Sequence, residues 1–119
     1  LGLAMYYISH GQKKKAEPLL QYAVEHYKLQ MKRFPRLEDK MQLLLAKAYS
    51  LLEDKKDALK VLGNIIHYNL YYQSELKYNP LFDPIRNEPG FTEILSSMEK
   101  RYRTEREKAR KLLVELGEI

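Results

Sequence analysis

Residues 3–23 have the sequence LAMYYISHGQKKKAEPLLQYA, and residues 45–65 repeat its pattern as LAKAYSLLEDKKDALKVLGNI. At an offset of 42 residues, equivalent positions carry a leucine-alanine pair, a tyrosine, a second alanine and a second leucine: Leu3/Leu45, Ala4/Ala46, Tyr7/Tyr49, Ala16/Ala58 and Leu20/Leu62. Recurrence of small, aromatic and aliphatic residues at a fixed period is typical of repeat proteins. The sequence therefore predicts an all-α fold built from antiparallel helix-turn-helix repeats.

Apolar residues at three- and four-residue steps predict helices near residues 1–10, 14–34 and 37–52, and another that begins near Ala58. Short polar turns separate these helices, so consecutive helices are expected to be antiparallel neighbours. The small residues at the repeated alanine positions let two helices approach closely. Residues 1–78 are thus predicted to form two helical hairpins, and the helix at residues 1–8 is expected to present a face with no neighbour from the chain.

The rest of the chain is predicted to close this repeat pair. Residues 79–90 contain three prolines and are expected to form a linker with a short helix at Asp83-Pro84. Residues 91–119 are expected to form one long C-terminal capping helix. Its apolar residues step by three and four along a heptad seam, interrupted at Glu105. Four seam residues beyond the first half of the helix are candidates for self-association as a homodimer: Tyr102, Ala109, Leu112 and Leu116.

The two repeats resemble tetratricopeptide repeats. The first unit matches the family pattern at Leu3, Ala4, Tyr7, Gly11, Ala16, Leu20 and Ala23, and the second at Leu45, Ala46, Tyr49, Ala58 and Leu62. The second unit departs from the family pattern at Glu53 and Ile65, position 42 is Gln where the family has Trp, and the 42-residue offset exceeds the family period of about 34. The resemblance implies a right-handed superhelix that mediates protein-protein contacts.

The segment from Asn79 to Phe91 resembles the part that closes tetratricopeptide arrays in bacterial multidomain signalling proteins of the cyclase-like and transcriptional-regulator types. The chain also starts within the repeat pattern. We therefore expect it to be the C-terminal repeat region of a larger signalling or regulatory protein. In that register, a protein or peptide partner is expected in an inner groove formed by the first helix of each unit: Met5, Ile8, Ser9, Lys40, Leu44, Lys47, Ser50 and Leu51.

Two alternatives stay open beside the hypothesis of a protein-protein interaction scaffold. One is a helical nucleic-acid-binding module that uses the basic clusters at 13–15 and 100–111, although the net charge of only +5 makes nucleic acid the less favoured partner. The other is a dimerisation module that pairs through the last helix. Leu44 and Leu51 could also serve helix packing instead of a groove.

Composition argues against several other classes. The 119 residues contain no cysteine, which excludes disulfides, thiolate metal sites and thiol nucleophiles and favours a cytoplasmic location. No apolar run reaches the roughly 20 residues of a membrane span. The three histidines, His10, His26 and His67, are scattered, and no nucleophile elbow or phosphate loop occurs. The sequence therefore predicts no metal site, no cofactor and no catalytic site.

Overall fold

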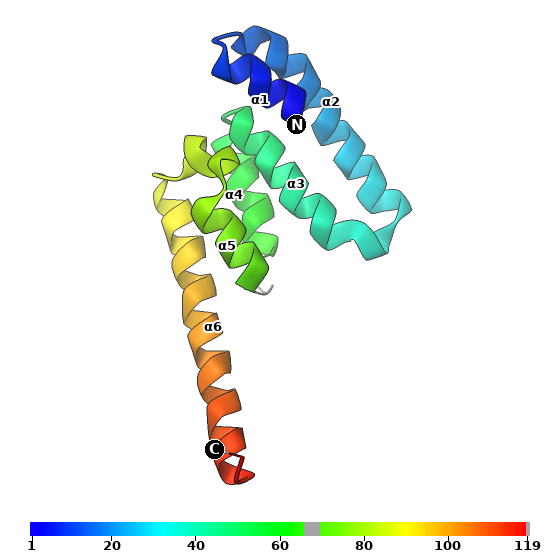
Figure 1. The fold of residues 1–119 in the computed structure, drawn as a ribbon. Coiled ribbons are helices and arrows are strands. Elements are labelled where there is room, and N and C mark those ends of the chain that lie inside the picture. The colour runs from blue at the N-terminus through cyan, green and yellow to red at the C-terminus, as the bar shows by residue number, and fades with distance from the viewer. Residues whose placement is uncertain (66–69, 119) are drawn as a thin grey trace.

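The computed structural model describes residues 1–65 and 70–118, with the backbone alone at positions 70 and 71, and within these residues it is all-α without a strand. Its elements are the α-helices α1 (Gly2–Ser9), α2 (Lys13–Arg33), α3 (Glu38–Leu51), α4 (Lys55–Asn64), α5 (Leu70–Tyr78) and α6 (Pro89–Glu115), and the short 3-10 helices η1 (Pro35–Leu37) and η2 (Pro80–Ile85). The molecule measures 59 × 33 × 22 Å. Figure 1 shows the α1–α2 hairpin at one end and the tip of α6 at the other.

The turns inside the two hairpins have the same backbone geometry. Gly11 and Glu53, which are 42 residues apart, both adopt left-handed φ angles, of 72° and 59°. In the first turn the amides of Gly11 and Gln12 donate to the carbonyls of Ile8 and Tyr7. In the second, the amides at 53 and 54 donate to the carbonyls at 50 and 49, which is the same pattern at the same offset. The repeat seen in the sequence is therefore also a repeat of turn structure.

The equivalent small and aliphatic residues lie in the core. Ala4 and Ala46, Ala16 and Ala58, and Leu20 and Leu62 are all buried, with at most 2 % exposure. The small side chains let α1 pack on α2 and α3 pack on α4, while α2 lies along α3 and joins the two hairpins. At that junction Lys28 lies over the ring of Tyr49, and the hydrogen bond between them raises the pKa of Lys28.

The segment after α5 fastens the chain to the repeat pair. Phe82 and Ile85 of η2 and Phe91 of α6 are buried, as expected for residues that close the end of the helix pair, and the rings of Phe82 and Phe91 are 6.0 Å apart. The guanidinium of Arg86 donates hydrogen bonds of 2.7, 2.7 and 2.8 Å to the carbonyls of residues 76, 77 and 79. Arg86 thereby satisfies carbonyl groups at the end of α5, where helices lack internal donors.

Four details differ from the sequence-based expectations. Helix α4 begins at Lys55 and not near Ala58, because the Asp54 side chain accepts a hydrogen bond from the backbone amide of Asp57 and caps the helix. Residues 1–78 contain α5 in addition to the two hairpins. The short helix in the linker begins at Pro80 instead of Asp83-Pro84, because the Asn79 side chain accepts a hydrogen bond from the amide of Leu81 and caps it there. The long helix α6 begins at Pro89, two residues before the predicted boundary, since proline is well suited to the first turn of a helix.

Only the first half of α6 caps the repeats. It packs on α4 and α5, buries Phe91 and Met98, and is held by two ion pairs, Lys55–Glu88 at 2.8 Å and Lys77–Glu99 at 3.3 Å. From position 100 to position 118 every residue is exposed. The second half therefore projects from the domain as a single helix, as Figure 1 shows.

Candidate interaction surfaces

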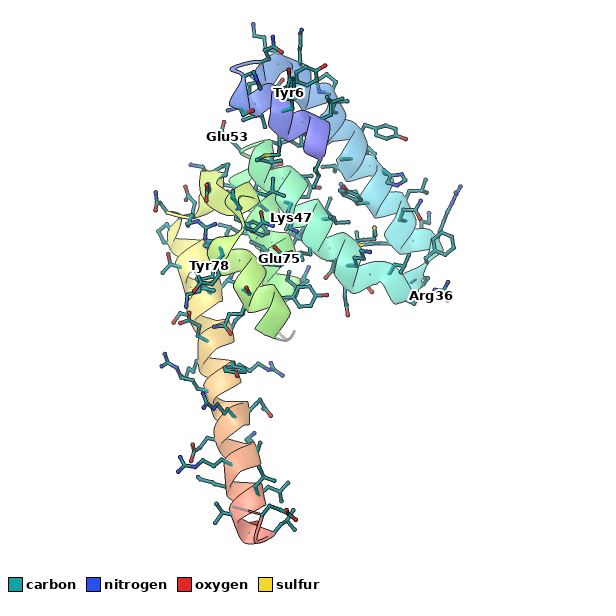
Figure 2. The ribbon with its side chains drawn as sticks, viewed as in Figure 1. Tyr6, Arg36, Lys47, Glu53, Glu75 and Tyr78 are labelled. Atoms are coloured by element: carbon teal, nitrogen blue, oxygen red, sulfur yellow. The ribbon has the colours of Figure 1, made fainter. Side chains whose placement is uncertain are left out.

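The inner face of α3, where a peptide groove was predicted, is covered by the chain itself. Lys47 is only 7 % exposed, and its ammonium lies 3.2 Å from a carboxylate oxygen of Glu75 on α5. Figure 2 shows these two side chains pointing toward one another between the helices. The other carboxylate oxygen of Glu75 accepts a hydrogen bond of 2.7 Å from the side-chain amide of Asn79. A partner peptide cannot reach Lys47 without displacing α5.

Ser50 and Leu51, farther along α3, are also buried. The Ser50 hydroxyl donates a hydrogen bond of 2.7 Å to the carbonyl of Leu81 in η2, and Leu51 packs with Ala4, Ala16 and Leu20 of the first hairpin. The prediction that Lys47, Ser50 and Leu51 line an open groove is therefore wrong. The physical reason is that α5 and η2 form the next layer on α3, and the first hairpin covers Leu51.

The other predicted groove residues do not form one surface. Met5 and Ile8 are partly buried against the cluster of Ala4 and Leu51. Ser9 is exposed, and its hydroxyl donates to the carbonyl of Tyr6 at 2.9 Å. On α3, Lys40 is exposed and Leu44 is partly buried. The structure therefore does not join the α1 residues and the α3 residues into a continuous groove.

A different apolar surface lies on the first hairpin, where α1 and α2 leave large apolar side chains exposed. Its exposed side chains include Leu3 (55 %), Tyr6 (56 %) and Tyr22 (72 %). A shallow cleft of about 240 Å³ opens there between the two helices, lined by Leu1, Leu3, Ala4, Leu19, Tyr22, Ala23, His26 and Tyr27. We call this surface the α1–α2 face. Within it Tyr22 and His26 stack, with ring centroids 6.1 Å apart, and partial burial raises the pKa of Tyr27.

Comparison of repeat-equivalent residues shows that the α1–α2 face lacks a neighbouring helix within the part of the chain that the structure describes. Leu45 on α3, equivalent to Leu3, is 4 % exposed, and Ala48, equivalent to Tyr6, is fully buried. The second hairpin therefore buries these positions, with α2 lying along α3, whereas the first hairpin exposes them. Tyrosine and leucine on a contiguous exposed surface are characteristic of protein interfaces. Sequence reasoning expected an uncovered face on the first helix but did not single out Leu3, Tyr6 or Tyr22.

The candidate self-association residues lie on the projecting half of α6. Tyr102 is 40 % exposed, Leu112 55 % and Leu116 65 %, and Ala109 is exposed as well. They lie along one side of the helix because they are spaced by three, four and seven residues. The structure places them together on a free surface, which we call the α6 arm (residues 101–116).

The two basic clusters considered for nucleic acid lie far apart. The first, at 13–15, is at the start of α2, where Lys13 pairs with Glu53 in the neighbouring turn. The second, at 100–111, follows the α6 arm at the opposite end of the molecule, as Figure 1 shows. They do not combine into one basic surface.

Metal sites and membrane-spanning helices are both absent from the part of the chain that the structure describes. No three histidine, cysteine, aspartate or glutamate side chains there come together as a metal site, and His67 lies outside the described residues. None of the helices described is both long enough and apolar enough to span a membrane. A scan of protein-family models finds no matching family, and searches of curated proteins and of solved structures find no significant match.

Proposed function

We propose that this chain is a protein-protein interaction scaffold that binds a helical segment of a partner protein on the α1–α2 face. The observation that carries the proposal is the contrast between equivalent positions: Leu3 is 55 % exposed where Leu45 is 4 % exposed. A position that is packed against other helices in the second hairpin is thus exposed to solvent on the α1–α2 face. Docking an amphipathic helix would bury Leu3 and Tyr6 in the way that the second hairpin buries Leu45 and Ala48, and it would also cover Tyr22.

The wider setting of this scaffold is part of the same proposal. The resemblance of the repeats to tetratricopeptide repeats, and of residues 79–91 to the closing segment of arrays in bacterial signalling proteins, supports a role as the repeat region of a larger signalling or regulatory protein. In this role the chain recruits a partner and does not itself catalyse a reaction. We also propose a cytoplasmic location, which the lack of cysteine favours.

Site-specific photo-cross-linking tests the binding face. A photoreactive amino acid replaces either Tyr22 or Tyr78, two tyrosines that are each 72 % exposed but lie on different parts of the molecule. The proteins are irradiated in the cells that naturally produce the chain, and the cross-linked peptides are identified by mass spectrometry. The proposal predicts cross-links from position 22 to one amphipathic helical segment of another protein, and far fewer from position 78.

The variant Leu3→Asp provides the second arm of this experiment. Because Leu3 is exposed in the free chain, the substitution should leave the fold intact while placing a charge in the cleft. Cross-linking from position 22 should then disappear. Equal cross-linking from positions 22 and 78, or cross-linking that survives Leu3→Asp, would refute the assignment of the α1–α2 face.

A further inference from the structure

The α6 arm is a second surface, independent of the α1–α2 face, and its composition defines what it can bind. The 16 residues of the arm extend over about 24 Å of helix. All of them are exposed. An isolated helix of this length is marginal in water, and most helices are stabilised by packing an apolar face. An arm that presents such a face without a neighbour is suited to bind another helix.

The apolar stripe of the arm continues the seam that α6 uses inside the domain. In the packed half, Phe91 and Met98 are 1 % and 3 % exposed, against α4 and α5. Seven-residue steps lead from Met98 through Glu105 to Leu112, and from Leu95, which is partly buried against the core, to Tyr102, Ala109 and Leu116. The surface that contacts helices in the domain thus runs on past the point where those helices end. This continuity indicates that the missing neighbour is also a helix.

Charge defines the partner further. Positions 100–118 contain seven basic and four acidic residues, a net charge of +3. In the heptad numbering set by the stripe, the arm positions that flank the apolar seam and meet the edge of a partner helix are Arg101, Arg106, Lys108, Leu113 and Glu115. Lys108 also lies 3.7 Å from Glu105 within the arm. Glu115 is the one acidic residue among the five, against three basic residues. A partner with carboxylates at its own flanking positions would be complementary to them.

A second copy of this chain is less complementary to the arm than an acidic helix is. Parallel pairing would set Glu105 against Glu105 of the second copy inside the seam and bring Arg101 near Arg106. Antiparallel pairing, with Tyr102 opposite Leu112, would set Arg106 against Arg106 and Lys108 against Lys108 at its centre, with Arg101 against Glu115 at each end. Like charges at such positions are unfavourable. Glu105 within the apolar stripe also disfavours insertion into lipid, because a carboxylate would enter the apolar layer.

We propose that the α6 arm binds an acidic amphipathic helix of another protein. The apolar stripe of that helix lies against Tyr102, Leu112 and Leu116, and its carboxylates lie against the basic residues that flank the stripe. The chain then has a binding surface at each end, and the two surfaces can be inactivated separately.

Two synthetic peptides test this inference. Both have three heptads with leucine at the seam positions; one has glutamate at all flanking positions, and the other has lysine there. Their binding to the full chain is measured by fluorescence anisotropy at low and at physiological salt. The glutamate peptide is expected to bind at least about tenfold more tightly than the lysine peptide, with weaker binding at higher salt.

Matched variants of the chain identify the surface. Leu112 and Val114 are each 55 % exposed, but Val114 lies on the opposite side of the helix. Leu112→Gln should weaken binding of the glutamate peptide about tenfold, and Val114→Gln should leave it within about twofold. Likewise Arg106→Glu, beside the seam, should weaken binding more than Arg103→Glu, away from it. Because all four side chains are exposed, the helix content measured by circular dichroism should not change.

Four results would overturn the inference. The first is equal affinity for the two peptides, and the second is an equal effect of Leu112→Gln and Val114→Gln. The third is a chain that is dimeric by light scattering and becomes monomeric with Leu112→Gln. The fourth is preferred binding to duplex DNA or to anionic vesicles, with no loss on Leu112→Gln. None of these results bears on the cross-links from position 22, so the two proposals fail independently.

Discussion

Glycine at position 53 is predicted to give a more stable protein than alanine at the same position. Glu53 has a φ angle of 59°, close to the 72° of its repeat equivalent Gly11. A residue with a side chain in this left-handed conformation costs roughly 1–2 kcal/mol, while glycine loses roughly 0.5–1 kcal/mol more backbone entropy on folding. The difference leaves Glu53→Gly more stable than Glu53→Ala by about 1 kcal/mol.

Alanine is the proper reference because both substitutions remove the ion pair with Lys13. Both side chains of that pair are 51 % exposed, so its contribution is at most about 1 kcal/mol, and it cancels in the comparison. The same reasoning predicts that Gly11→Ala destabilises by about 1 kcal/mol. Gly63 provides the opposite control, since it lies within α4 with open space around an added Cβ, and Gly63→Ala should stabilise by roughly 0.5–1 kcal/mol.

Urea denaturation followed by circular dichroism measures the free energies of unfolding of these variants. A difference of about 1 kcal/mol is easily resolved in this way. In a thermal unfolding experiment on the same variants it would correspond to about 4 °C in melting temperature for a chain of this size. If alanine at position 53 proves as stable as glycine, Glu53 is not in the left-handed conformation. The equivalence of the two turns, and with it the structural repeat, would then be refuted.

Three further predictions concern polar contacts. Lys47→Ala removes a partner of Glu75, whose side chain is 17 % exposed, and should cost about 2 kcal/mol in urea denaturation, whereas Lys40→Ala at an exposed site should cost less than about 0.5 kcal/mol. Arg86→Lys cannot reach the carbonyls of residues 76, 77 and 79 together and should cost about 2 kcal/mol by the same assay; an unchanged stability would show that these hydrogen bonds contribute nothing net. The hydrogen bond from Lys13 lowers the pKa of Glu53 below its ordinary 4.5, so the stability from this pair is present above that pH and is lost as the pH falls through the lowered pKa. The difference in stability between wild type and Glu53→Gln should therefore shrink as the pH is lowered below 4.5, and a difference that stays constant on acidification would contradict the contact.

The hairpins could be predicted because their pattern is local. Ala4 and Ala16, and their equivalents Ala46 and Ala58, mark the close approach of adjacent helices, and all four are buried. Apolar spacing placed helices α2 and α3 within a residue of their observed boundaries. The turn at Glu53 shows that the second hairpin keeps the backbone of the first even where glycine is absent, since the surrounding packing offsets the strain.

The closed inner face could not be predicted, because it depends on contacts between distant residues. Lys47 and Ser50 are polar residues within the otherwise largely apolar stretch at 43–51 of α3, a pattern that indicates exposure to solvent. Their partners, Glu75 and the carbonyl of Leu81, lie 28 and 31 residues farther along the chain. No periodic pattern links those positions. The hydrogen bonds of Arg86 could not be predicted for a similar reason. Its acceptors are backbone carbonyls, which every residue has, so no residue type in the sequence indicates them.

The sequence likewise could not show which side of the first helix is open. Residues 1–8 are apolar on more than one face, so spacing alone does not separate the side that packs on α2 and Leu51 from the side that is exposed. Only the arrangement of the two hairpins shows that Ala4 faces inward while Leu3 and Tyr6 are exposed. The candidate interaction site therefore lies on the outer face of the first hairpin, and not on the inner face of α3, where it was predicted.

Lysine labelling tests most directly whether α5 and η2 cover the inner face of α3. If they do, the α1–α2 face and the α6 arm are the surfaces that remain for partners. The intact protein is treated briefly with an amine-reactive reagent, and mass spectrometry compares the labelling rates of Lys47 and Lys40 on the same helix. Lys47 is 7 % exposed and paired with Glu75, whereas Lys40 is exposed, so Lys47 should react much more slowly. Equal rates would mean that α5 and η2 do not cover α3, and that the inner face is an open peptide groove after all.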